Sequence, residues 1–304
     1  MKVLYTSDIH VHPGHLECFL RAGRELCPEV MILGGDLIPD WRGSIEASIE
    51  PHRLWVRDVL LPRIKQFRSA FSQTAVLLDL GNDDIAAARP LIEAKDGMDL
   101  HLIHRRVVEI GERLAVVGYM AVNPTPFKIK DCERPDCRDQ DGLSNPRVLI
   151  KGYVTASGVV MPYTLNLAGS SIEDDLDELS MLLESPRWFN HSFIFVAHAP
   201  PRDTVLDQME NGSHVGSLAV RRFIERWGST GRLLASFHGH IHESPWMTGR
   251  IRQEVGGIPS FNVGQHSQTL RCLLIDIQTP GDSACLVTVT RAGEVTVMEK
   301  DRVF

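Results

Sequence analysis

The sequence predicts an α/β fold, because short apolar strands alternate with amphipathic helices along most of the chain and more strands follow near its C-terminal end. Five apolar runs are too short for buried helices and are typical of interior strands. These runs span residues 2–6, 30–33, 75–80, 193–197 and 233–237. Apolar residues recur at helical spacing within the segments 16–27, 54–67 and 176–183. Such alternation predicts parallel strands joined by helices.

The remaining regions predict a second sheet and an antiparallel (α+β) component. Residues 106–110 and 114–119 face each other across Gly111 and Glu112, which is typical of a hairpin, and we expect the second sheet to begin there. Four C-terminal segments alternate residue types between turn signals and are predicted to be antiparallel strands. These segments are 260–263, 270–277, 285–290 and 294–298.

Residues 123–167 interrupt this pattern and are predicted to form an insertion within a single domain that spans residues 1–304. The segment is first rich in Pro, Asp and Arg and then contains a hairpin-like stretch, 153–161, centred on Ser157 and Gly158. A structureless loop of this length is unusual in a compact domain and is more often functional. The sequence is compatible both with a cap that limits ligand size and with a plain surface excursion.

The composition is that of an ordinary globular protein. The 304 residues are 43% hydrophobic and 23% charged, which allows a large buried core. No apolar stretch approaches the roughly 18 residues of a membrane span, and the chain begins with a strand rather than a signal sequence, so we expect a cytoplasmic protein. The net charge of -7 argues against broad attachment to nucleic acid, which depends on a basic face.

The six cysteines are expected to be free thiols, because a chain of this size does not need disulfides and carries no export signal. Cys132 and Cys137 are spaced C-x4-C inside the insertion. They could hold a structural zinc ion only together with two further ligands, and no paired motif supplies these.

Each predicted interior strand ends in polar residues that can bind a metal ion. The endings are Asp8-Ile9-His10, Gly35-Asp36, Gly81-Asn82, Ala197-His198 and Gly239-His240-Ile241-His242. Taken singly, each has an ordinary structural explanation, such as a helix N-cap or a turn. Their joint occurrence favours a shared site, because the carboxyl ends of parallel strands meet at one edge of a sheet. Spacing by two also places both side chains of a pair on one face of an extended segment.

In the order of these motifs, the chain resembles the calcineurin-like metallophosphoesterase family, whose series is D-x-H, G-D, G-N-H-D/E, H and G-H-x-H. The similarity extends over almost the whole chain. It implies two packed mixed sheets flanked by helices, a four-layer αββα sandwich, in agreement with the strand pattern. It also implies two metal sites that share one carboxylate. The first would be bound by Asp8, His10 and His242 and the second by Asn82, His198 and His240, with Asp36 bridging the two ions.

The resemblance implies a metal-dependent phosphoesterase. Two divalent cations that share a carboxylate lower the pKa of a bridging water and supply hydroxide near neutral pH, in position to attack phosphorus in line with the leaving oxygen. Imidazole, carboxylate and amide ligands without thiolate favour manganese or iron, with zinc, cobalt or nickel as further choices. The expected substrate is a small organic phosphate or nucleotide, a phosphodiester in preference to a phosphomonoester. The alternatives are a nuclease of the same family and a metal-binding scaffold with little turnover.

Asp83 departs from the family pattern, because many members have a histidine at this position of the G-N-H-D/E motif. An imidazolium can donate a proton to the leaving oxygen, whereas an aspartate beside two dications is expected to stay ionised. We therefore count Asp83 with Asp36 and Asn82 as candidate catalytic residues and expect weaker hydrolysis of esters with alkyl leaving groups, unless another histidine supplies the proton. The candidates for that role are His12, His15 and His214.

Two further segments could contribute to the site. Gly216 and Ser217 open an amphipathic stretch, 218–227, whose N-terminus could receive phosphate oxygens, although a serine N-cap is the favoured interpretation. Asn262 and Gly264 resemble the turn that follows the last metal motif in many family members. A plain turn at the end of a strand is the favoured interpretation there.

Overall fold

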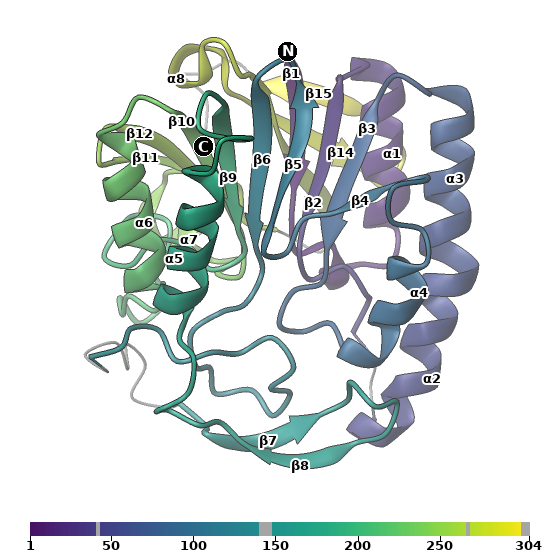
Figure 1. Ribbon diagram of the computed structural model, residues 1–304. Helices are drawn as coiled ribbons and strands as arrows, with labels where there is room; N and C mark the ends of the chain where they lie inside the picture. Colours follow the sequence, from purple (N-terminus) through teal and green to yellow (C-terminus); the bar gives the residue numbers. More distant parts are fainter. Residues whose placement is uncertain (41–42, 140–147, 266–267, 299–304) are drawn as a thin grey trace.

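The computed structural model describes residues 1–40, 43–139, 148–265 and 268–298, and it contains two mixed β-sheets with helices on both outer faces (Figure 1). The strands are β1 (Lys2–Thr6), β2 (Val30–Gly34), β3 (Ala75–Asp79), β4 (His101–Leu102), β5 (Arg106–Gly111), β6 (Leu114–Tyr119), β7 (Lys151–Val154), β8 (Met161–Thr164), β9 (Ser192–Ala197), β10 (Leu233–His238), β11 (Arg252–Val255), β12 (Ile258–Asn262), β13 (Thr269–Asp276), β14 (Cys285–Thr290) and β15 (Val295–Met298). The helices are α1 (His15–Leu26), α2 (Ile45–Trp55), α3 (Leu61–Ala70), α4 (Arg89–Glu93), α5 (Ile172–Leu183), α6 (Leu218–Gly228), α7 (Ser244–Thr248) and α8 (Pro280–Ser283), with short helical turns η1 (Ile9–Val11), η2 (Val56–Leu60) and η3 (Ala86–Ala88).

The first sheet joins the two ends of the described chain. Its order is β15-β14-β13-β1-β2-β3-β4. The three N-terminal strands pair in parallel, as their apolar runs predict, with Val3 opposite Val30 and Val30 opposite Ala75. The C-terminal strands continue the sheet on the other side of β1 and pair antiparallel with their neighbours, as predicted.

The second sheet has the order β11-β12-β10-β9-β6-β5. The predicted hairpin of β5 and β6 is confirmed and forms one edge of this sheet. The prediction that residues 260–263 belong to an antiparallel C-terminal group is wrong in part. Strand β12 pairs antiparallel with β11 but parallel with β10, with Ser236 opposite Ser260. An alternating residue pattern shows a half-buried strand but does not encode the direction of its neighbour.

Three apolar clusters, one between the two sheets and one under the helices on each side, show that the fold has four layers. Successive residues of a strand point to opposite faces of the sheet. Val3 and Tyr5 of β1 pack between the two sheets, where Val116 of β6 also lies. Leu4 instead packs under the helices of the first sheet, and Val117 under α5 and α6 of the second. Helices α1 to α4 flank one side and α5 and α6 the other (Figure 1), so the expected sandwich of helices, two mixed sheets and helices is confirmed.

The helices follow the predicted spacing but differ in length. The segment predicted as a helix over 54–67 belongs to an uninterrupted run of α2, η2 and α3, which covers residues 45–70 and includes one π-helical turn. Strands β4 and β11 and the short helices α4, α7 and α8 were not predicted, because so few residues carry no measurable periodicity. None of the helices in the described residues is long and apolar enough to cross a bilayer.

The segment predicted as an insertion leaves β6 and contains the hairpin of β7 and β8, close to the predicted 153–161. Residues 140–147, which fall within it, lie outside the described residues. In Figure 1 the hairpin crosses the molecule beyond the carboxyl ends of β1, β2 and β3. Backbone hydrogen bonds tie the hairpin to the start of the segment, where Tyr153 N donates to Lys128 O (2.8 Å). All six cysteines are free thiols, and Cys137 is buried.

Candidate metal centre

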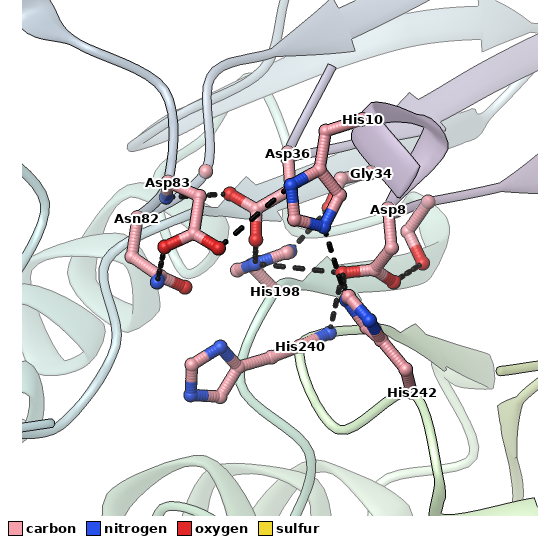
Figure 2. Close-up of polar contacts among 12 residues, drawn as sticks. Asp8, His10, Gly34, Asp36, Asn82, Asp83, His198, His240 and His242 are labelled. Atoms are coloured by element: carbon pink, nitrogen blue, oxygen red, sulfur yellow. Dashed lines mark hydrogen bonds and ion pairs between the residues drawn. The ribbon is translucent and has the colours of Figure 1, made fainter. Parts of the chain in front are cut away.

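The loops after five strands converge on one site, but the strands come from two sheets rather than one. Asp8, Asp36 and Asn82 follow β1, β2 and β3 of the first sheet. His198 follows β9 and His240 follows β10, both of the second sheet. The site therefore lies where the carboxyl edges of two facing sheets meet. In Figure 2 the side chains of Asp8, His10, Asp36, His198 and His242 point toward one another.

One group of possible ligands consists of Asp8, His10, Asp36 and His242, whose ligand atoms all lie within 4.8 Å of one another. His242 Nε2 lies 3.2 Å from Asp8 Oδ1 and also 3.2 Å from His10 Nε2. Two imidazole nitrogens that face each other at this distance need a proton or a cation between them. The arrangement therefore fits a metal ion held by these side chains.

A second group consists of Asp36, His198 and His240, again with all ligand atoms within 4.8 Å. His198 Nε2 lies 3.0 Å from Asp36 Oδ2, and His198 Nδ1 is fixed by Gly34 O at 2.8 Å. Because Nδ1 faces a carbonyl it carries the proton, which leaves Nε2 as the ligand atom. Asp36 belongs to both groups, so its two oxygens can serve two ions.

Asn82 supplies an unpaired buried oxygen beside these groups. Its side chain is buried, and its Oδ1 atom accepts no hydrogen bond within the described part of the chain. Its Nδ2 donates to Asp83 Oδ1 (2.9 Å), and Asp83 N donates to Asp36 Oδ1 (2.8 Å). A buried oxygen without a donor is costly unless a ligand occupies it. The unpaired oxygen of Asn82 is thus a second observation, independent of the carboxylate groups, that fits a pair of cations.

The backbone of the site adopts uncommon conformations. Asp8, Asp36 and His240 have φ values of 56°, 53° and 67°, in the left-handed region that residues other than glycine seldom adopt. Such strain persists only where surrounding contacts enforce it, and it is frequent at functional sites. Gly35 precedes Asp36 with a φ of 100°, and a Cβ atom there would lie 2.6 Å from His198 Nδ1. A glycine is therefore required where the two sheets approach.

In the metal-free protein, the buried carboxylates and imidazoles stabilise each other's charged forms. Burial raises the pKa of Asp36, but His198 and His10 outweigh it and lower that pKa to about 2. Burial lowers the pKa of His10, but Asp40 and the other carboxylates raise it to about 10. The same balance, through Asp36 and Asp8, raises the pKa of His198 to about 9. Metal ions must therefore displace protons from these imidazoles when they bind.

Two aspartates missed by the sequence analysis hold the site in place. Asp84 is fully buried and accepts hydrogen bonds from the backbone of Leu37 (3.0 Å), Ile38 (2.7 Å) and Gly81 (2.9 Å). It thereby ties the loop that carries Asp36 to the loop that carries Asn82. Its place in the G-N-H-D/E motif was the available signal. Asp40 Oδ1 lies 3.0 Å from His10 Nδ1 and orients that ring, and no motif indicated it.

Two buried polar residues hold the ligand loops of the second sheet. His238 Nδ1 lies 3.0 Å from Ala197 O and 3.1 Å from Ala199 O, the carbonyls on either side of His198. Asn262 Nδ2 donates to Gly239 O (3.3 Å) and Ile241 O (3.1 Å), the carbonyls on either side of His240. Asn262 Oδ1 also accepts from Gly264 N (2.9 Å), which is the turn that the sequence predicts.

Asp83 lies at the mouth of the site, with its side chain 31% exposed. One carboxylate oxygen lies 3.8 Å from His10 Nδ1. Burial and the neighbouring Asp36 raise the pKa of Asp83 to about 7 in the metal-free protein, against the pull of His10 and His242. In the metal-loaded site we expect the pKa of Asp83 to be lowered instead, because cations favour the ionised carboxylate.

The three histidines considered as proton donors have structural partners. His214 Nδ1 lies 2.7 Å from Asp207 Oδ1, and its side chain is 34% exposed. His12 Nδ1 accepts from Gly14 N (3.0 Å), and its ring lies against that of His15. A catalytic role for His214 stays a prediction. Its neighbour Val215, however, lines a pocket that also contains His240.

The N-terminus of α6 is already occupied by a side chain. Ser217 is the N-cap, as favoured from the sequence, and its hydroxyl accepts from Val220 N (3.0 Å). Asp136 accepts hydrogen bonds from Leu218 N (2.8 Å) and Ala219 N (3.3 Å). The alternative expectation, that this helix end receives phosphate oxygens, is therefore not supported, because an internal carboxylate takes the free amides.

Fold and site together place carboxylates and imidazoles from two facing sheets in two groups of side chains that could each hold a metal ion. The family model of calcineurin-like phosphoesterases matches residues 1–244. The chain belongs to this family, and it is a metal-dependent phosphoester hydrolase. Strands β11 to β15 lie beyond the matched segment and complete both sheets.

Two solved structures share this fold at low sequence identity. One crystal structure shares 13% identity with a TM-score of 0.58 and covers 98% of each chain. The protein TT1561 of Thermus thermophilus shares 15% identity with a TM-score of 0.53, over 95% of this chain and 98% of that one. A putative 5'-nucleotidase from Staphylococcus aureus shares 12% identity with a TM-score of 0.48, over 100% of this chain and 55% of that one. A search of curated proteins found no match.

Proposed function

We propose that the protein hydrolyses a phosphodiester of a small organic alcohol at a pair of divalent cations. The observation that carries the proposal is the position of Asp36, whose carboxylate belongs both to the group of Asp8, His10 and His242 and to the group of His198 and His240. A shared carboxylate is how a protein holds two cations close enough to act on one phosphate.

The side chains of the proposed site have two roles, because some would bind the metal ions and others orient the ligand rings. Asp8, His10 and His242 would hold one ion and Asn82, His198 and His240 the other, with Asp36 between them. When bound, the two cations supply an activated water and neutralise charge on the phosphate oxygens. Oxygen and imidazole ligands favour manganese or iron, with zinc, cobalt and nickel as further choices. Asp40 and the Gly34 carbonyl keep the rings of His10 and His198 in position for these roles.

The acidic side chains around the cluster favour a diester over a monoester. Asp83 and Asp40 add two carboxylates beside those of Asp8 and Asp36, and the Asp40 side chain is 73% exposed. Near the metals each carboxylate repels an anionic substrate. A diester carries one negative charge and a monoester about two near neutral pH, so the diester is repelled less. The same charges oppose the nuclease alternative, because nucleic acid is a polyanion that binds to basic surfaces.

The segment after β6 supports a cap over the proposed site. Residues 123–127 and His240 line the same pocket, and the hairpin of β7 and β8 lies at the end of the molecule where the ligand loops converge (Figure 1). We infer that this segment restricts the substrate to a small ester.

The proposal is tested by hydrolysis of paired aryl phosphate diester and monoester substrates. Metal-stripped protein is supplied in turn with manganese, iron, zinc, cobalt, nickel and magnesium. We expect turnover that depends on the metal, with a higher kcat/KM for the diester. A monoester preference would refute the charge argument. Tight metal binding without turnover on either substrate would favour the scaffold alternative.

A matched pair of variants separates the shared carboxylate from general effects of substitution. Asp36→Asn keeps the shape of the side chain and removes its charge, and it is expected to abolish turnover. Asp203→Asn is the control, because Asp203 also has a left-handed backbone, with a φ of 58°, but its side chain is 61% exposed and outside the cluster. Equal activity of both variants would contradict a bridging role for Asp36.

A further inference from the structure

A small pocket opens directly beside the second group of metal ligands. It has a volume of about 100 Å³ and includes His240 among its lining residues. Three segments form its walls: residues 123–127 of the cap, the loop between β9 and α6, and the loop that follows β10. A group bound there would lie next to a phosphate held at His240.

The lining of the pocket is mainly apolar. Val215 and Ile241 are each only 6% exposed and belong to its buried part, whereas Phe127 is 47% exposed at its rim. Pro124 and Pro126 continue the apolar wall on the cap side. Among the described residues that line the pocket, the ionisable side chains are His240 and Glu243. An apolar surface with an acidic group at its edge selects an uncharged ligand.

The cap wall is held rigidly by a buried ion pair. Lys130 and Glu133 have fully buried side chains, and Lys130 Nζ lies 2.8 Å from both carboxylate oxygens of Glu133. Lys130 Nζ also donates to Thr125 O (3.1 Å), and Glu133 accepts from Thr125 N (3.2 Å). Thr125 in turn accepts from Phe127 N (3.0 Å). These bonds hold residues 125–127 in one conformation.

Hydrogen bonds also join the three walls to one another. Asn123 Nδ2 donates to Val215 O (3.0 Å), which connects the cap to the loop before α6. Gln208 N donates to Ser244 Oγ (3.0 Å), which connects that loop to the segment after His242. The pocket is therefore formed before any ligand arrives, and the ligand does not have to order it.

We propose that this pocket binds an uncharged apolar group of the substrate, a short alkyl chain, esterified to the phosphate. The inference rests on the proposed function and names its substrate class. The pocket of about 100 Å³ is smaller than the roughly 150 Å³ cavity that accommodates benzene, so its volume suits a short alkyl chain rather than a ring. Glu243, which also lines the pocket, disfavours a second phosphate or carboxylate on that group.

The test measures binding of non-hydrolysable phosphonates to manganese-loaded protein by calorimetry. Methylphosphonate, propylphosphonate and 2-carboxyethylphosphonate share the anionic head and differ only in the group that would enter the pocket. Each buried methylene contributes a factor of roughly four in affinity. We expect propylphosphonate, with two more methylenes, to bind about 15-fold more tightly than methylphosphonate, and the carboxyethyl compound more weakly than the propyl one.

Variants assign the effect to the pocket. Phe127→Ala removes the apolar rim, and Val215→Phe fills the buried end, so both are expected to bring the ratio of propyl to methyl affinity close to one. Phe189→Ala is the matched control, because Phe189 is 54% exposed and lies outside the pocket. This control should keep the ratio of about 15. Thermal unfolding with bound manganese verifies that each variant is folded.

The outcomes separate the pocket from the hydrolase. Equal affinity for methyl- and propylphosphonate, or a ratio that both pocket variants leave unchanged, would overturn the assignment of the pocket while the hydrolysis assay with metals stands. Failure of the loaded protein to bind any phosphonate, together with absence of turnover, would overturn the proposed function itself.

Discussion

Asn262 provides the sharpest test of how the fold holds the ligand loops. Its side chain is fully buried, with Nδ2 donating to the carbonyls of Leu206 (2.9 Å), Gly239 and Ile241, and Oδ1 accepting from Gly264 N. Asn262→Ala leaves those buried groups without their partner. The two amide protons and the one amide oxygen make about three full hydrogen bonds. A net loss of about 1 kcal/mol for each bond, with an added cost for orphaned buried groups, gives a destabilisation of roughly 3 to 4 kcal/mol.

This loss is a large fraction of the stability of a folded domain, which is about 5 to 15 kcal/mol. We therefore expect a clear shift of the urea unfolding midpoint of metal-free protein, followed by circular dichroism. The loop that carries His240 and His242 should also lose its fixed position, so manganese affinity should fall by about 10- to 100-fold. Asn262→Asp retains the shape but faces carbonyl oxygens with an acceptor, and it should behave similarly.

An exposed asparagine serves as the control for Asn262. Asn211 Oδ1 accepts from Ser213 N (3.0 Å) in a surface turn, so Asn211→Ala should change stability by less than about 0.5 kcal/mol. An unfolding free energy of Asn262→Ala within about 0.5 kcal/mol of the wild type, together with unchanged manganese affinity, would refute the role assigned to Asn262. A stability loss without a change in metal affinity would contradict the positioning role alone.

Three further predictions concern charge. The pKa values of His10, about 10, and His198, about 9, lie above the unfolded value of roughly 6.5. The charged forms of these two histidines stabilise the metal-free protein fully below about pH 6.5, and this stabilisation is lost as pH rises through 9 to 10. The Tm of the metal-free protein should therefore fall over that range, while metal affinity should rise from pH 6 to 9. A flat profile of both Tm and metal affinity against pH would contradict this. Asp83→His should raise turnover of substrates with alkyl leaving groups more than of aryl substrates, and unchanged kcat/KM on both would count against a role for this position. Lys130→Met leaves the buried carboxylate of Glu133 unpaired and should cost about 3 to 5 kcal/mol in urea unfolding, most of which the double variant with Glu133→Leu should recover if the lost charge pairing is the cause.

The strands and the candidate ligands could be predicted because both depend on local pattern. An apolar run of five residues is buried wherever it lies, and a polar pair spaced by two, such as Asp8 and His10, keeps both side chains on one side of an extended chain. The order of these motifs along the chain was sufficient for the family and for the two-sheet fold. It was also sufficient to select the residues that the structure brings together, although their metal-binding roles stay predictions.

Tertiary structure alone decided which distant groups hold those ligands. Asn262 was predicted as a turn residue, and its contacts with the carbonyls of Gly239 and Ile241 exist only because β12 lies parallel to β10. The carboxylate of Asp136 at the start of α6 and the walls of the pocket beside His240 likewise join segments far apart in sequence. Local periodicity reports whether a residue is buried, whereas the partner of a buried polar group is set by how sheets and loops pack, which no single segment encodes.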